Sequence, residues 1–164
     1  MQITAPVEVE LEDPTAKMGH WQDQNIDSLV ASQNNPQDAA KDHFIQRNGV
    51  EFAGTHLLLD LYSASNLDNI AHIELAIRDI VAACGATLLH IHLHHFTPSG
   101  GVSGVAVLAE SHISVHTWPE RDYAAFDVFM CGDAQPENAV PVLKRAFFPK
   151  RIEVCEELRG QVEK

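Results

Sequence analysis

The stretch GVSGVAVLAESHISVHTWPE, residues 101–120, decides how this chain folds. Its pattern predicts two β-strands, Val102–Leu108 and His112–Trp118. Only residues 109–111 lie between the two runs, so the strands join through a short connection. That connection holds an acidic residue followed by a serine, Glu110-Ser111. The segment therefore predicts a strand pair with reactive polar residues at its junction.

Further strands are predicted on both sides of this pair. Phe52–Tyr62 precedes it, and Tyr123–Cys131 and the short Ile152–Glu156 follow it. The alternation is clearest in Thr87–Phe96, where leucine and isoleucine occupy one face and histidine the other. The apolar positions are Leu89, Ile91 and Leu93, and the polar positions are His90, His92 and His94.

Two helices are predicted between the strands. The first is capped by Ser65 or Asn66 and ends at Gly85. The second starts near Pro136, a good first-turn residue, whereas Pro141 implies a kink or a later start. The inward positions are Ile70, Ile73, Ile77, Ile80, Val81 and Cys84 in the first helix, and Leu143, Ala146 and Phe147 in the second.

A sheet with one apolar and one polar face needs only one layer of helices. We therefore predict an α+β fold, a two-layer sandwich in which two helices cover one face of a mainly antiparallel sheet. Residues 49–164 are expected to form this single domain. Residues 1–48 are polar and acidic without a sustained apolar period, which predicts a flexible extension.

The composition of the 164 residues excludes several classes of protein. A formal net charge of -12 argues against a nucleic-acid partner, which calls for a basic face. No apolar run is long enough to span a membrane, and the first residues do not resemble a secretory signal. The three cysteines, Cys84, Cys131 and Cys155, are widely spaced and odd in number. They predict free thiols in a reducing cytoplasm.

Ser111 can carry unusual chemistry if the chain holds it in a tight junction. Its hydroxyl can attack the Glu110 carbonyl and turn the amide into an ester. Loss of the Ser111 α-proton then expels the Glu110 carboxylate by β-elimination. The resulting dehydroalanine becomes an imine, and hydrolysis leaves a pyruvoyl group at a new N-terminus. A nearby base must take the α-proton, and imidazole is suited to that task near neutral pH.

The segment GVSGVAVLAESHISVHTWPE, followed by YAAFDVFMCG, closely resembles the short prokaryotic S-adenosylmethionine decarboxylase proenzymes. Supporting similarity runs from GTHLLLDLY at Gly54 to ELRG at Gly160, which covers the whole predicted domain. The resemblance implies self-cleavage between Glu110 and Ser111 into a β chain, residues 1–110, and an α chain, residues 111–164. It also implies a homodimer of cleaved protomers that pair their sheets, so that each active site takes residues from both.

The same resemblance implies individual roles. Ser111 becomes a covalent pyruvoyl cofactor that binds S-adenosylmethionine as a Schiff base and withdraws the electrons left by carbon dioxide. His116 is the proton acceptor in processing, Ser103 assists it, and Cys131 donates the proton that completes decarboxylation. Phe96 is expected to stack on adenine and Glu120 to receive the ribose hydroxyls. The product is the aminopropyl donor for spermidine biosynthesis.

One expectation conflicts with strand geometry. Ser111 and His116 are five residues apart, so a regular strand puts them on opposite faces. A turn or bulge near residues 110–112 is therefore predicted to bring the two side chains together.

The sequence also offers other interpretations, of which two are disfavoured and two stay open as alternative functions. His90, His92, His94 and His95 resemble a metal-binding strand, but no cysteine or carboxylate is spaced to complete a site, so no metal is expected. GVSGV is not a nucleophile elbow, because Gly104 directly follows Ser103. A non-catalytic relative that regulates or binds a ligand, and a pyruvoyl decarboxylase for another amino acid, are the alternative functions.

Overall fold

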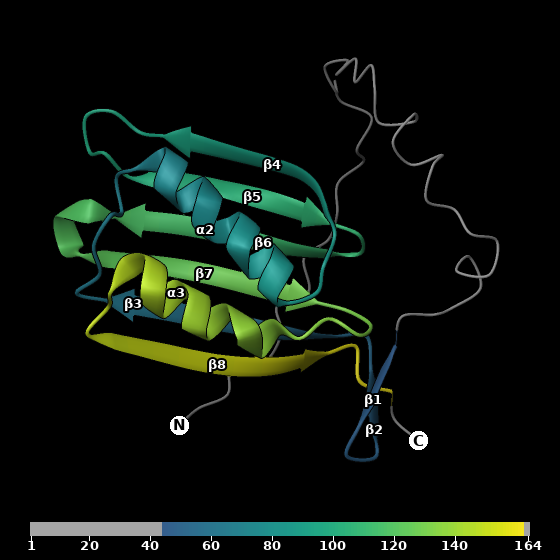
Figure 1. Ribbon diagram of the computed structural model, residues 1–164. Coiled ribbons are helices and arrows are strands. Elements are labelled where there is room, and N and C mark those ends of the chain that lie inside the picture. Colours follow the sequence, from purple (N-terminus) through teal and green to yellow (C-terminus); the bar gives the residue numbers. More distant parts are fainter. Residues whose placement is uncertain (1–43, 163–164) are drawn as a thin grey trace, which may run out of the picture. The chain divides into compact units, whose positions relative to one another are not determined.

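The computed structural model describes residues 44–162, and nearly all of the predicted extension over residues 1–48 lies outside them (Figure 1). A separate two-stranded hairpin consists of β1 (Ile45–Arg47) and β2 (Val50–Phe52). The main sheet holds β3 (Gly54–Tyr62), β4 (Leu88–His95), β5 (Val102–Leu108), β6 (Ser111–Trp118), β7 (Tyr123–Met130) and β8 (Arg151–Arg159). The helices are α2 (Ile70–Ala83) and α3 (Ala139–Phe147), and the 3-10 turns are η1 (Pro119–Arg121) and η2 (Pro136–Asn138).

The main sheet is antiparallel throughout. Its strand order is β4-β5-β6-β7-β3-β8, so β3 lies between two strands from the C-terminal third of the chain. Both helices lie on one face of this sheet (Figure 1). The predicted two-layer α+β sandwich is thereby confirmed. The predicted strand Phe52–Tyr62 is in fact two strands interrupted at Ala53, and the last strand is longer than Ile152–Glu156.

The start of α2 differs from the prediction. Asn69 is the N-cap, and its side chain accepts a hydrogen bond from the His72 N–H at 3.1 Å. Ser65 and Asn66 instead lie in the preceding loop, where their side chains donate to main-chain carbonyls at the end of α3. They therefore tie the loop to the neighbouring helix rather than starting their own.

Of the two alternatives that Pro141 left open, a kink or a later start of the second helix, the structure has the later start. α3 begins at Ala139, which puts Pro141 in its first turn. A first-turn N–H has no partner within the helix, so proline is tolerated there. At the other end, Phe148 closes the helix in the left-handed conformation.

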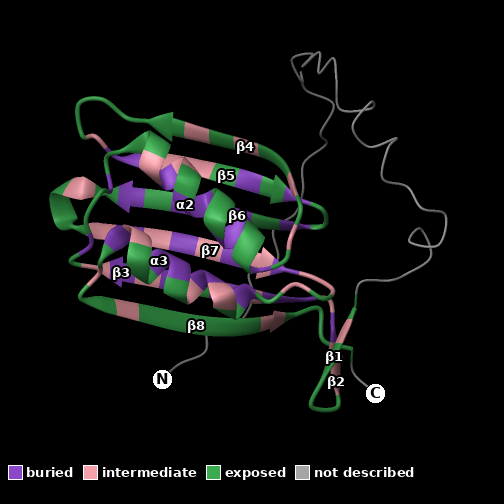
Figure 2. Cartoon of the chain, in the orientation of Figure 1, coloured by how far each residue is buried: buried purple, intermediate pink, exposed green. Residues whose placement is uncertain are grey.

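The face of the sheet toward the helices forms the core. Alternate residues of β3, β6 and β7 are buried there, as Figure 2 shows by the purple bands on these strands. Leu89 departs from the predicted pattern and is 54% exposed. The pairing of β4 with β5 shifts register between Leu88 and His90, so the irregularity takes Leu89 out of the core. Ile70 is also more exposed than predicted, because it is the first residue of α2.

The opposite side of the sheet, called here the open face, is not covered by a helix among the described residues. It carries polar groups such as Asp127, which accepts a hydrogen bond from Ser114 at 2.6 Å. It also carries large apolar side chains that are exposed in one protomer, namely Leu58, Val105, Val107 and Trp118. A face of this composition is suited to a further packing layer.

Within the described residues, no helix is both long and apolar enough to cross a membrane. The three cysteines are free thiols, with Cys84 buried, Cys131 half-buried and Cys155 exposed.

Candidate active site

The connection between β5 and β6 is a two-residue turn. Leu108 and Ser111 face each other across the two strands, so only Ala109 and Glu110 lie between them. Glu110 has a φ of +132°, a backbone conformation that favours glycine and is strained for a residue with a side chain. The peptide bond between Glu110 and Ser111 therefore directly follows the residue with a positive φ in the β5–β6 hairpin.

Ser111 is the first residue of β6 and points toward the helix side of the sheet, where it is 8% exposed. Its Oγ accepts a hydrogen bond from the Cys131 N–H at 3.1 Å. Cys131 is held there because β7 pairs with β6 in register and ends one residue earlier, at Met130. Gly132 follows with a φ of +60°, which turns the chain back beside the serine.

A small cavity of about 160 Å³ opens beside Ser111 and Cys131. We call it the Ser111 cavity; its walls are Gly85, Ala86, Thr87, Ala109, Ser111, Cys131, Gly132, Asp133 and Ala134. Burial raises the pKa of the Cys131 thiol, and the nearby Glu110 carboxylate raises it further. The thiol is therefore held in its protonated form near neutral pH, as a proton donor must be.

Ser103 and His116 form a second polar pair. They face each other across β5 and β6 on the open face, and Ser103 Oγ lies 2.7 Å from His116 Nδ1. The His116 ring is exposed and lies beside Trp118, with 6.0 Å between the ring centroids. Strand pairing alone thus holds the hydroxyl against the imidazole.

The prediction that a turn or bulge brings Ser111 to His116 is wrong for a single chain. The turn exists, at Ala109 and Glu110, but it ends before Ser111, and β6 then runs without interruption to Trp118. Five residues of strand separate the two side chains by roughly 17 Å, and they point to opposite faces. Side chains of β6 thus alternate between the two faces along its whole length, and the expected contact between Ser111 and His116 does not form within one chain.

Phe96 and Glu120 lie at the same end of the sheet as Ser103 and His116. Phe96 directly follows β4, is 45% exposed and meets the His94 ring edge to face. Glu120 lies in η1, directly after β6, and its side chain is exposed. The candidate residues therefore divide into two groups at opposite ends of β6. One group is Ser111 and Cys131, and the other is Ser103, His116, Phe96 and Glu120.

A model of the S-adenosylmethionine decarboxylase family matches residues 55–160. The chain belongs to this family. The curated S-adenosylmethionine decarboxylase proenzyme of Thermomicrobium roseum is 48% identical over 110 residues, which are 66% of this chain and 95% of the relative. The proenzyme of Methanococcus maripaludis strain C7 is 47% identical over 113 residues, 67% of this chain and 92% of the relative.

A solved structure agrees with this membership. The crystal structure of the adenosylmethionine decarboxylase from Aquifex aeolicus matches with a TM-score of 0.62 at 35% sequence identity. It covers 69% of this chain and 95% of its own. The resemblance inferred from GVSGVAVLAESHISVHTWPE and YAAFDVFMCG is thereby confirmed, both as a family and as a fold.

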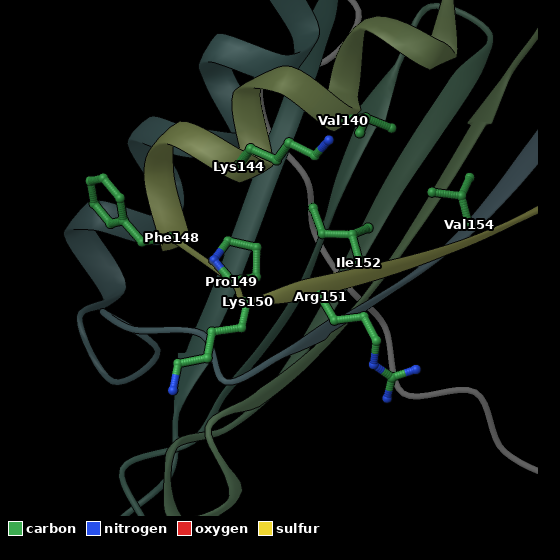
Figure 3. Close-up of a pocket in the computed structure, with 8 residues that line it drawn as sticks. All are labelled: Val140, Lys144, Phe148, Pro149, Lys150, Arg151, Ile152 and Val154. Atoms are coloured by element: carbon green, nitrogen blue, oxygen red, sulfur yellow. The ribbon is translucent and has the colours of Figure 1, made fainter.

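A hollow larger than the Ser111 cavity, of about 540 Å³, lies away from the Ser111 end. It lies between α3 and the start of β8, where Figure 3 shows Val140, Ile152 and Val154 beside the stem of Lys144. The four strand histidines, His90, His92, His94 and His95, are exposed on the edge strand β4. No group of three or more histidine, cysteine or acidic side chains able to hold a metal occurs within residues 44–162.

Sequence reasoning missed two features of this S-adenosylmethionine decarboxylase fold. One is the positive φ of Glu110, because no glycine or asparagine marks that turn. The other is Asp133, the charged residue in the wall of the Ser111 cavity. Its position two residues after Cys131, beyond a turn glycine, was the available signal.

Proposed function

We propose that this protein is a pyruvoyl-dependent S-adenosylmethionine decarboxylase, made as a precursor that cuts itself between Glu110 and Ser111. Family membership supports the substrate and the precursor. The observation that carries the proposal is local: a strained Glu110 precedes a nearly buried Ser111, and Cys131 lies against that serine. The product would be an aminopropyl donor for spermidine synthesis.

In the precursor, Ser111 attacks the Glu110 carbonyl carbon and the peptide becomes an ester through Oγ. Strain at Glu110 favours this step, because leaving the amide releases part of the conformational cost. The Cys131 N–H stays close to Oγ, which becomes part of the departing carboxylate during β-elimination. In that elimination a base removes the Ser111 α-proton, and we assign this role to His116 with Ser103 as its hydrogen-bond partner. Hydrolysis of the imine that follows releases ammonia and leaves the pyruvoyl group.

The residues around position 111 fit a pyruvoyl group. Ser111 supplies its three carbons, and the Ser111 cavity has room beside it for a small aliphatic chain. When present, the pyruvoyl carbonyl accepts the substrate amine and withdraws the electron pair left by carbon dioxide. Cys131 keeps its proton at neutral pH because its pKa is raised, and it delivers that proton to the substrate carbon. No metal is assigned to this chemistry.

The two groups of residues require a second protomer. Ser103 and His116 lie at the far end of β6 from Ser111, on the open face. If two protomers stack their open faces around a twofold axis with their strands antiparallel, the β5–β6 turn of one lies at the His116 end of the other. Because the Ser111 side chain points to the helix side in the uncut chain, the Glu110–Ser111 segment has to turn toward the open face for the two groups to meet. The exposed Leu58, Val105 and Trp118 on that face support such a layer. Phe96 and Glu120 would reach the substrate from the partner in the same way.

The cleavage proposal is tested by intact mass of the denatured protein beside a Ser111→Ala variant. We expect two chains in the wild type, residues 1–110 and a pyruvoyl-blocked chain from residue 111, and one chain in the variant. Carbon dioxide release is then measured from S-adenosylmethionine, ornithine and arginine. An uncut, inactive wild type would favour a non-catalytic regulator, and release from ornithine or arginine alone would favour a different decarboxylase.

The shared site is tested by complementation. Ser111→Ala and His116→Ala chains carrying different tags are produced separately and together. Neither variant should be cut alone. In the mixed dimer, the intact Ser111 of the His116→Ala chain meets the intact His116 of its partner, so that chain alone should be cleaved. Absence of cleavage in purified mixed dimers would refute a site built from two protomers.

The free thiols also support a proposed cytoplasmic location, because reduced cysteines are typical of that compartment. The extension over residues 1–48 and the domain over residues 49–164 remain a proposed division of the chain.

A further inference from the structure

The hollow between α3 and the start of β8, called here the basic hollow, lies where the positive charges of the chain are concentrated. Four of the eleven lysines and arginines fall between residues 144 and 151, although the chain has a formal net charge of -12. Three of these four line the basic hollow, namely Lys144, Lys150 and Arg151. No aspartate or glutamate occurs between residues 138 and 152. The basic hollow is therefore a local positive surface on an acidic chain.

Two of the three cations in the basic hollow are available to a ligand. The Arg151 side chain is already paired with the Glu153 carboxylate, and it lies over the Tyr62 ring, 3.8 Å from the ring centroid. Within the described part of the chain, by contrast, neither Lys144 nor Lys150 takes part in an ion pair, and both residues are exposed. Figure 3 shows that Lys144 extends from α3 and Lys150 from the segment before β8. Their ammonium groups therefore come to the hollow from two different elements.

The remaining walls of the basic hollow are mostly apolar. Val140 and Ile152 are half-buried and pack against the core, whereas Val154 is 48% and Phe148 68% exposed. The dipole of α3 favours a cation such as Lys144 in the last turn, but it does not account for apolar side chains exposed beside that cation. Apolar surface that is hollowed, exposed and rimmed by charge is typical of a binding site.

The volume and the chemistry of the basic hollow together indicate a class of ligand. Its volume of about 540 Å³ falls within the range of roughly 300–1,000 Å³ found for pockets that enclose small organic molecules. Lysine ammonium groups bind carboxylate, sulfonate or phosphate oxygens through charge-assisted hydrogen bonds. Apolar walls stabilise the hydrocarbon part of the same ligand by removing it from water. An inorganic anion would use only the first feature, and an uncharged hydrocarbon only the second.

We propose that the basic hollow binds a small organic anion with an apolar body. The acidic group of the ligand is held by Lys144 and Lys150, and its apolar body packs against Val140, Ile152 and Val154. No residue lines both the basic hollow and the Ser111 cavity. The site is therefore separate from the proposed decarboxylation chemistry, and its test does not depend on that chemistry.

The test uses two fluorescent probes whose emission rises on apolar surfaces. 8-Anilinonaphthalene-1-sulfonate carries an acidic group, and N-phenyl-1-naphthylamine is its uncharged counterpart. Both are titrated into the full-length wild type, Lys144→Gln, Lys150→Gln and Val154→Thr, after intact mass has shown that all proteins are cleaved to the same extent. Arg145→Gln is the matched control, because Arg145 is the next residue of α3 and does not line the basic hollow.

We expect the dissociation constant of the sulfonate to rise about threefold in each lysine variant, since exposed ion pairs are weak. The uncharged probe should bind these variants as it binds the wild type, and the control should be unchanged with both probes. Val154→Thr should weaken both probes, because it replaces a methyl group in the apolar wall by a hydroxyl. Added salt should weaken the sulfonate in the wild type more than in either lysine variant.

Three outcomes would overturn the proposal. Equal affinity of the sulfonate for the wild type and both lysine variants would place the probe elsewhere, for example on the apolar residues of the open face. Displacement of the sulfonate by inorganic phosphate as effectively as by phenyl phosphate would show that the apolar walls take no part. A change of oligomeric state in the lysine variants, measured by sedimentation, would show that the basic hollow is an interface between copies of the chain.

Discussion

Thr117 is the buried polar residue whose removal should cost the fold most clearly. It is 6% exposed, and its hydroxyl donates to the Leu67 carbonyl at 2.7 Å and accepts from the Val102 N–H at 2.8 Å. These two bonds fix the loop before α2 and the start of β5, next to Ser103. Thr117→Val keeps the shape of the side chain but leaves one buried donor and one buried acceptor without this partner.

The size of the loss follows from those two groups. Because each unsatisfied buried group costs about 1–3 kcal/mol, and the added methyl recovers part of that, Thr117→Val should lower the free energy of unfolding by about 2–4 kcal/mol. Thr117→Ser keeps the hydroxyl and loses one methyl group, so about 1 kcal/mol is expected. The difference between the two variants isolates the hydrogen bonds from the packing.

The assay is urea unfolding followed by far-ultraviolet circular dichroism, at fixed protein concentration. All proteins carry Ser111→Ala, so that each remains one uncut chain and no cleavage confuses the comparison. A loss below 1 kcal/mol in Thr117→Val, or equal losses in the two variants, would refute the argument that these hydrogen bonds hold the loop to the sheet.

Three further predictions concern the proposed reaction. Glu110→Gly should relieve the strain of the positive φ, so in the uncut Ser111→Ala chain it should raise the free energy of unfolding by about 1 kcal/mol. When Ser111 is present, the same substitution should slow cleavage. An unchanged cleavage rate, measured by mass spectrometry, would argue against stored strain. Cys131→Ala should still be cut but should lose about 10²–10⁴-fold in kcat, measured as carbon dioxide release, and near-normal turnover would exclude the thiol as donor. Because Glu110 raises the pKa of Cys131, Glu110→Gln in the uncut chain should lower that pKa, so alkylation of Cys131 by iodoacetamide at pH 8 should become faster; an unaltered pH profile would contradict the electrostatic contact.

The sequence was a good guide to the strands and a poorer one to their ends. The alternation in Tyr123–Cys131 has a period typical of a half-buried strand, and this strand and the one predicted over Val102–Leu108 were both placed within a residue. The helix cap was misplaced because Ser65, Asn66 and Asn69 have equally good capping chemistry. Only the packing of the loop against α3 decides among them.

The site was harder to predict than the fold for a physical reason. Periodicity correctly separates Ser111 from His116, whereas the implied roles require them to meet. One chain cannot satisfy both, and a single sequence does not reveal contacts made by a second copy. Leu89 is a smaller example, since a register shift in a pair of strands leaves no mark in the residues themselves.

The position of β3 between β7 and β8 has a consequence for how the enzyme can be made. A cut after Glu110 would place β3 in one fragment and its neighbours β7 and β8 in the other. The paired strands β5 and β6 would likewise belong to different fragments. The fragments would then be interleaved, and neither could leave without opening three strand ladders. After denaturation the two fragments would have to reassemble in a bimolecular reaction, whose rate falls as the protein is diluted. One continuous chain is therefore the form in which this sheet folds most readily. Synthesis as a precursor would thus supply the connectivity for folding, and cleavage would come only once it was no longer needed.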